Sequence, residues 1–140
     1  FKAVNDSLGH AAGDHVLQTA ARIMVEATRD IDTVARVGGD EFTLLLPGVT
    51  GNAHLAQVAE RIITRLEQPI RFDGAACRIS ASIGSIGVKA GQDAVAEDIL
   101  SDADAALYRS KQAGRARHTV HGETVPDAMQ KGMEKPHALQ

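Results

Sequence analysis

Apolar side chains recur at helical spacing in three long segments, and this pattern predicts three amphipathic helices. The first covers residues 14–29, the second begins with an N-cap at Asn52, and the third covers residues 93–113. Pro69 ends the second helix, and Gly114 ends the third. The second helix has the clearest apolar stripe, formed by Leu55, Val58, Ala59, Ile62, Ile63 and Leu66.

Short apolar and β-branched runs predict strands between these helices. Two of the runs flank a glycine-rich turn and are typical of a β-hairpin. Gly84 and Gly87 lie in a longer run, where they indicate close packing or a bulge. The predicted strands cover residues 33–37 and 42–46, a short pair around Asp73 and Gly74, and residues 79–88 and 117–120. This order predicts an α+β sandwich, an antiparallel or mixed sheet with helices packed on it.

The two ends of the chain lack a sustained pattern. Residues 1–14 are rich in Gly, Asn, Asp and His, so we expect short irregular structure that leads into the first helix. Residues 122–140 combine Pro and Gly with polar residues, so we expect a disordered tail. The folded domain is therefore expected over residues 1–121.

The composition fits one globular domain that does not bind nucleic-acid polymers. The 140 residues are 44% hydrophobic, and 15 Lys and Arg face 18 Asp and Glu, which leaves a net charge of −3. A phosphate-seeking surface needs surplus positive charge, so this balance argues against general nucleic-acid binding. No apolar run approaches the roughly 20 residues that cross a bilayer. The single cysteine, Cys77, excludes an internal disulfide and a cysteine-based zinc site, and we expect it to be buried as a small apolar side chain.

The turn Gly38-Gly39-Asp40-Glu41 is the most informative local feature. Glycine and aspartate are ordinary residues in an exposed hairpin turn, and this is the simpler interpretation. The alternative is a phosphate site, because two glycines leave room for a nucleotide's phosphates and two carboxylates can hold the magnesium ions that screen them.

A second polar cluster precedes the first predicted helix. Asp14 would favour the positive end of the helix dipole, and Asn5 and Asp6 are common in turns. An Asn amide and an Asp carboxylate can also satisfy a guanine edge together, the carboxylate accepting from the ring N–H and the exocyclic amine.

A third cluster closes the last predicted helix. Lys111 and Arg115 lie four residues apart at the helix end, where cations are favoured in any case. Taken alone, this pair is typical of a solvated helix C-terminus.

In this order, the clusters resemble the GGDEF family of diguanylate cyclases over residues 1–121. Each motif alone is weak, but five in register are specific. They are Phe1-Lys2, Asn5-Asp6, Gly9-His10 with Gly13-Asp14, the run from Arg36 to Phe42, and the last-helix pattern of Ala103-Asp104, Ala106-Leu107-Tyr108, Lys111 and Gly114-Arg115. The resemblance implies a ferredoxin-like fold similar to the palm of nucleotide cyclases and polymerases.

The resemblance implies a nucleotidyltransferase that joins two GTP molecules into cyclic di-GMP, a bacterial second messenger, and releases two pyrophosphates. Each domain would hold one GTP, so a homodimer is implied, in which each 3′-hydroxyl attacks the other α-phosphate. Asp40 is implied to ligate Mg²⁺ (or Mn²⁺) and to assist deprotonation of the nucleophile, with Glu41 beside it as the second catalytic residue. The residues implied to bind GTP are Asn5 and Asp14 on the guanine, His10, Gly38 and Gly39 under the phosphates, and Lys111 and Arg115 on the triphosphate.

Arg29 and Asp32 form an Arg-x-x-Asp pattern that five intervening residues separate from Gly38. In the family this pattern is the inhibitory product site, since Arg can fork to guanine or phosphate and Asp can accept from a guanine edge. The alternative is an ion pair at a helix end, which is a frequent arrangement. Because the spacing to Gly38 also matches, the product site is favoured.

The resemblance further implies an aspartate-bearing strand immediately before Phe1. The chain as given begins at Phe1, so we expect it to lack this first strand and one metal-binding carboxylate. We therefore expect the isolated chain to be marginally stable and to turn over GTP poorly, whereas a longer parent is expected to be active. A cytoplasmic location is expected, with membrane anchoring of the parent left open. The rival interpretation is a catalytically inactive GGDEF module that binds GTP or cyclic di-GMP as a sensor.

Overall fold

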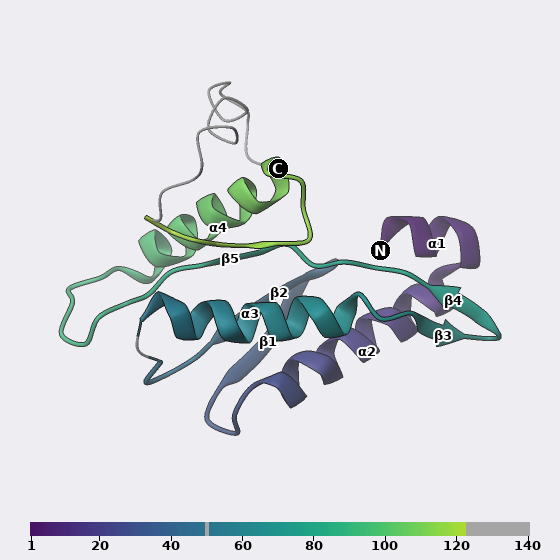
Figure 1. Ribbon diagram of the computed structural model, residues 1–140, viewed down its shortest axis with the longest axis horizontal. Helices are drawn as coiled ribbons and strands as arrows, with labels where there is room; N and C mark the ends of the chain where they lie inside the picture. Colours follow the sequence, from purple (N-terminus) through teal and green to yellow (C-terminus); the bar gives the residue numbers. More distant parts are fainter. Residues whose placement is uncertain (50, 123–140) are drawn as a thin grey trace. The chain divides into compact units, whose positions relative to one another are not determined.

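The computed structural model describes residues 1–49 and 51–122, in which helices and short strands are mixed along the chain (Figure 1). This confirms the predicted α+β class. The elements are α1 (Lys2–Leu8), α2 (His10–Ala27), β1 (Thr33–Gly38), β2 (Glu41–Leu45), α3 (Asn52–Leu66), β3 (Ile70–Phe72), β4 (Ala75–Cys77), β5 (Ile83–Ser85), α4 (Ala96–Gln112) and β6 (His118–Val120). Almost all of the predicted disordered tail, residues 123–140, lies outside the described residues.

The strands in the described part of the chain pair as three two-stranded sheets. β1 and β2 form the predicted antiparallel hairpin, with Val34 opposite Leu44 and Arg36 opposite Phe42. β3 and β4 form a second antiparallel pair, whereas β5 and β6 run parallel. The described strands therefore include both antiparallel and parallel pairs.

Two local predictions were wrong. Residues 1–14 are helical instead of irregular, because Val4 of α1 is buried in the core and Gly9, at φ +88°, separates α1 from α2. The predicted strand over residues 79–88 shrinks to β5, because its partner β6 offers only three residues, His118–Val120, for pairing.

The chain divides into two compact units. Of the described residues, the first unit comprises 1–49 and 61–80, and the second comprises 51–60 and 81–122. Helix α3 contributes its last part to the first unit and its earlier part to the second.

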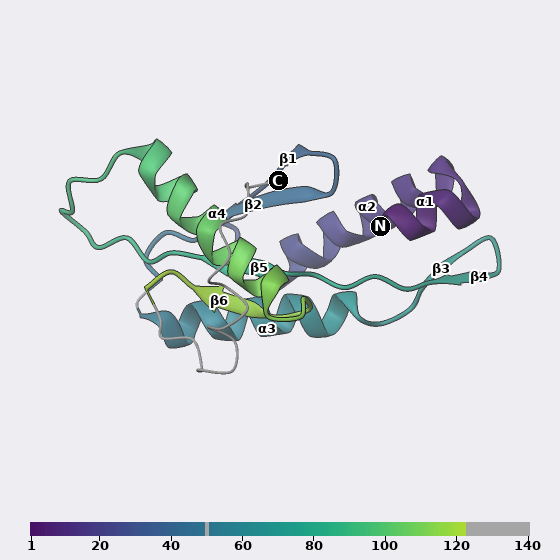
Figure 2. The same cartoon turned by 90° about the horizontal axis from the view of Figure 1, so that it is seen from above.

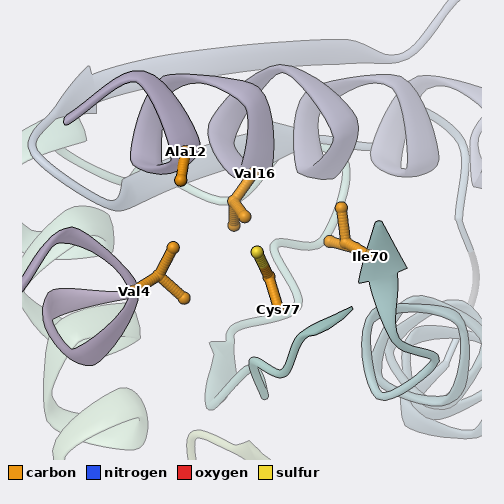
Figure 3. Close-up of a cluster of buried hydrophobic side chains, with 5 residues drawn as sticks. All are labelled: Val4, Ala12, Val16, Ile70 and Cys77. Atoms are coloured by element: carbon orange, nitrogen blue, oxygen red, sulfur yellow. The ribbon is translucent and has the colours of Figure 1, made fainter. Parts of the chain in front are cut away.

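The first unit has a core in which α1, α2 and the β3–β4 hairpin meet. The side chains of Val4, Ala12, Val16, Ile70 and Cys77 converge there (Figure 3). Cys77 is 1% exposed, as expected for a small apolar side chain. Burying a Val or Ile side chain stabilises a fold by about 1.5–3 kcal/mol, so this cluster anchors α1, the short helix that carries Asn5.

In the second unit, α4 packs directly on β5 and β6 (Figure 2). A Cβ atom at Gly84 would overlap the backbone nitrogen of Leu107, which confirms the close packing predicted there. Ser110 of α4 is fully buried, and its hydroxyl donates to the carbonyl oxygen of Ile83 at 2.7 Å and lies 2.8 Å from the Thr119 hydroxyl. This contact fixes the end of α4 that carries Lys111.

Candidate functional site

The tip of the β1–β2 hairpin is an open, acidic turn. A Cβ at Gly38 or Gly39 would meet no atom within 4 Å, and the φ of Gly39, +51°, is one that glycine adopts without strain. The Arg36 Nε donates to the carbonyl oxygen of Gly39 at 2.7 Å and so braces the turn. Asp40 and Glu41 are both exposed. The backbone and two carboxylates are therefore accessible to a ligand.

Asn5 of α1 lies against the first turns of α2. Gly13 is buried, and a Cβ there would overlap the side-chain oxygen of Asn5. Asp14 is the next residue along α2 and is exposed, as is His10 one turn earlier. The structure thus brings the Asn5 amide to the turn of α2 that carries Asp14, with half-buried Asn5 seated on the glycine.

Arg29 and Asp32 form a hydrogen-bonded ion pair in the segment that joins α2 to β1. The Asp32 carboxylate accepts from Nε and Nη2 of Arg29 at 3.1 and 2.7 Å, and from the backbone N–H of Arg29 at 2.7 Å. Arg29 Nη2 also donates to the carbonyl oxygen of Pro47 at 2.6 Å. The hydrogen bond with Asp32 raises the pKa of the Arg29 guanidinium above its ordinary value. The ion pair considered as the alternative interpretation therefore exists.

Lys111 and Arg115 belong to the second unit, whereas the other predicted site residues belong to the first. Lys111 is in the last turn of α4 and half-buried, and Arg115 is exposed. Arg115 and Ala116 have positive φ angles of +64° and +48°. The N–H of Arg115 donates to the carbonyl oxygen of Ser110 at 3.0 Å, and its own carbonyl accepts from Arg117 Nε at 3.0 Å.

Sequence reasoning missed two supporting residues. In the sequence, Arg36 is notable only as part of a motif, although a long side chain two residues before a Gly-Gly turn can reach the turn's carbonyl oxygens. The sequence assigns Gly13 no role, and its contact with Asn5 joins two helices in a way that periodicity does not reveal.

The carboxylates of the hairpin tip are the type of ligand that a magnesium ion prefers. Mg²⁺ prefers oxygen ligands and keeps several waters or substrate phosphate oxygens, so one or two carboxylates suffice from the protein. Among residues 1–49 and 51–122, no group of three or more His, Cys, Asp or Glu side chains could hold a metal ion. Asp40, with Glu41 beside it, is thus the candidate protein ligand at the tip.

The comparisons with known proteins agree on one family. Residues 1–117 match the model of the diguanylate cyclase GGDEF domain. Diguanylate cyclase A of Treponema denticola is 43% identical over 129 residues, which cover 91% of this chain and 34% of that protein. The chain thus spans about a third of the length of this relative.

Solved structures give the same result. The crystal structure of the GGDEF domain of TpbB (YfiN) from Pseudomonas aeruginosa has a TM-score of 0.77 and 35% identity, covering 88% of this chain and 76% of that one. The GGDEF domain of DgcB from Caulobacter crescentus, in complex with cyclic di-GMP, has a TM-score of 0.78 and 28% identity, covering 87% and 72%.

The mixed helices and small sheets are therefore those of the GGDEF domains of known diguanylate cyclases. The chain belongs to the GGDEF family. In the part of the chain that the structure describes, no helix is both long and apolar enough to cross a bilayer.

Proposed function

We propose that this domain is the catalytic unit of a diguanylate cyclase, which condenses two GTP molecules into cyclic di-GMP with release of two pyrophosphates. The observation that carries the proposal is the hairpin tip, where two unobstructed glycines precede two exposed carboxylates. The turn itself accounts for glycine at position 39, at φ +51°, whereas an open backbone beside two carboxylates is what a phosphate and its Mg²⁺ ion would use. The relatives named diguanylate cyclases support the same activity.

The guanine base is selected at the α1–α2 junction. The Asn5 amide and the Asp14 carboxylate present both acceptors and donors, which match the O6, N1–H and N2–H₂ groups of guanine. Adenine has a donor where guanine has O6 and no N1–H, so it would leave the Asp14 carboxylate unpaired. His10, one turn before Asp14, contributes to substrate binding from the same face.

The reacting phosphate lies over Gly38 and Gly39, where no side chain blocks it. Mg²⁺ (or Mn²⁺) held by Asp40 would supply charge to stabilise the transition state and the pyrophosphate that leaves. Asp40 also helps to remove the proton of the attacking 3′-hydroxyl, with Glu41 beside it. Lys111 and Arg115 neutralise the triphosphate. Because one domain holds one GTP, turnover requires two domains face to face, as a homodimer.

Product inhibition operates at Arg29 and Asp32. The ion pair does not use up the guanidinium: Asp32 and Pro47 accept from Nε and Nη2, while Nη1 has no hydrogen-bond partner among the described residues. Two N–H groups therefore remain to donate to a guanine or a phosphate of the product. The cyclic di-GMP complex of the DgcB domain shows that a GGDEF domain can bind this product.

The decisive experiment uses the full-length protein that carries this domain, incubated with GTP and Mg²⁺, with cyclic di-GMP measured by chromatography. The wild type should form product and Asp40→Ala should form none, with an unchanged far-UV spectrum because the exposed tip packs against little. Asp73→Asn removes the charge of another exposed turn aspartate and keeps a residue that tolerates its φ of +49°, so it is the control and should retain activity. Near-normal turnover by Asp40→Ala would refute the metal assignment.

A catalytically inactive module is the second candidate. Such a module would use the same open glycine backbone at Gly38 and Gly39 to bind a nucleotide without holding a metal ion. An inactive module would bind GTP or cyclic di-GMP in calorimetry but form no product under the same conditions, and this result would replace the first candidate with the second.

A further inference from the structure

A basic cavity in the first unit has no part in the proposed reaction. It has a volume of about 400 Å³ and is bordered by one face of α2, the last turn of α3 and the start of β3. We call it the arginine pocket. Its polar lining includes His15 and Arg22 of α2, Arg65 of α3 and Arg71 of β3, and Ile23 and Ile70 supply apolar surface.

The charge of the arginine pocket is opposite to that of the whole chain. Three guanidinium groups and an imidazole line it, and no carboxylate does. The chain as a whole carries 18 acidic against 15 basic residues. Such a local surplus in a concave site focuses a positive potential and attracts anions.

Glu26 is an acidic group beside the pocket, and its carboxylate is shared between Arg65 and Arg22. Its Oε2 accepts from Arg65 Nη2 at 2.5 Å, and its Oε1 lies 3.9 Å from Arg22 Nε. The hydrogen bond from Arg65, with the charges of Arg65 and Arg22, lowers the pKa of Glu26. One carboxylate between two guanidinium groups leaves positive charge uncompensated, and Arg71 adds a third cation.

The walls of the pocket are held in place before any ligand arrives. Ile23 and Ile70 are only 7% and 6% exposed, so the apolar floor is part of the core. The ring of His15 packs on Phe72, with 5.4 Å between the ring centroids. Glu26 orients the Arg65 fork. A site ordered in this way loses less side-chain entropy on binding.

We propose that the arginine pocket binds a small polyvalent oxyanion, whose phosphate or carboxylate groups are held by Arg65 and Arg71 with Arg22 at the rim. Planar guanidinium groups match both kinds of oxyanion through paired N–H donors. Glu26 competes with the ligand for Arg65 and thereby limits the affinity. The proposal stands independently of the cyclase activity.

The test is calorimetric titration with inorganic pyrophosphate and, separately, with citrate, in EDTA and at low salt. All proteins carry Lys111→Ala and Arg115→Ala, so that the proposed triphosphate site does not contribute. Amide chemical shifts of Thr19 and Ile23 locate the binding. A saturable pyrophosphate isotherm identifies phosphate as the ligand group, and a citrate isotherm identifies carboxylate.

Single changes then assign the residues. Arg65→Ala and Arg71→Ala should each weaken binding about tenfold or more, because a charged hydrogen bond contributes about 1.5–3 kcal/mol. Arg65→Lys, which keeps the charge but not the fork, should weaken it less, and Glu26→Gln should tighten it. Arg78→Ala removes an exposed arginine of the same unit outside the pocket and should change nothing.

Two results would overturn the proposal. One is the absence of saturable binding by either anion. The other is an equal loss in Arg78→Ala and Arg65→Ala, which would indicate diffuse charge attraction instead of a site. An unchanged affinity in Glu26→Gln would overturn the competition by Glu26.

Discussion

Gly84 is where the close packing of α4 on β5 can be tested most sharply. A Cβ there would overlap the backbone nitrogen of Leu107 and would lie 2.6 Å from both the carbonyl oxygen of Ala103 and the Cα of Leu107. All three atoms belong to the backbone of α4, so no side chain can rotate away. Gly84→Ala must therefore displace the helix from the strand.

The cost follows from what that displacement breaks. Forcing an extra carbon into a packed interface costs about 1–3 kcal/mol. The same movement stretches the hydrogen bond from Ser110 to Ile83, which contributes about another 0.5–1.5 kcal/mol, while the Ser110 hydroxyl keeps Thr119 as a partner. We expect Gly84→Ala to lower the free energy of unfolding by about 3 kcal/mol in total.

The assay is urea unfolding followed by far-UV circular dichroism, with Gly87→Ala as the matched control. A Cβ at Gly87 would meet only the side-chain oxygen of Asn52, at an ordinary 3.8 Å. The control should remain within about 0.5 kcal/mol of the wild type. If Gly84→Ala unfolds at the same urea concentration as Gly87→Ala, the close approach of α4 to β5 is wrong.

Further predictions concern strain, pH and product binding. Ala116→Gly should stabilise the fold by about 1 kcal/mol in urea unfolding, because Ala116 has a φ of +48°, whereas Ala113→Gly, at φ −76°, should not. Because the pKa of Glu26 is lowered on folding, its pairing with Arg65 stabilises the protein above pH 4.5 and is lost as pH falls through the lower folded-state pKa. The urea midpoints of wild type and Glu26→Gln should therefore differ at pH 6 and converge as the pH falls below 4.5, and a constant difference would contradict this. Arg29→Ala should weaken cyclic di-GMP binding in calorimetry and relieve product inhibition, and equal affinity would leave Arg29 with its structural role alone.

The long helices and the hairpins could be predicted from the sequence because one face of each helix is apolar and the turns contain glycine. Helix α1 could not, because Asn5 and Asp6 favour turns locally and its helical state depends on burying Val4. The strand predicted over residues 79–88 had the right composition, but a strand extends only as far as its partner, and β6 has three residues.

The candidate site shows the same limit. The motifs single out Asn5 and Asp14, but they do not reveal that the Asn5 side chain rests on Gly13, the residue before Asp14 on α2. The identity of a residue can be read from spacing, whereas a contact between two helices depends on how they pack.

Arg29 and Asp32 can form an ion pair and still have donors for a ligand. The sequence presented an ion pair and a product site as competing interpretations. The geometry makes them compatible, since Asp32 and Pro47 use Nε and Nη2 and leave the Nη1 donors available. The hydrogen bonds to Asp32 and Pro47 would then orient the guanidinium for a ligand. Arg29→Ala would remove both the hydrogen bond to Pro47 and the Nη1 donors. Arg29→Lys would keep a cation without the fork, so a loss of cyclic di-GMP affinity in both variants, with an unchanged urea midpoint in Arg29→Lys, would assign the loss to recognition instead of to folding.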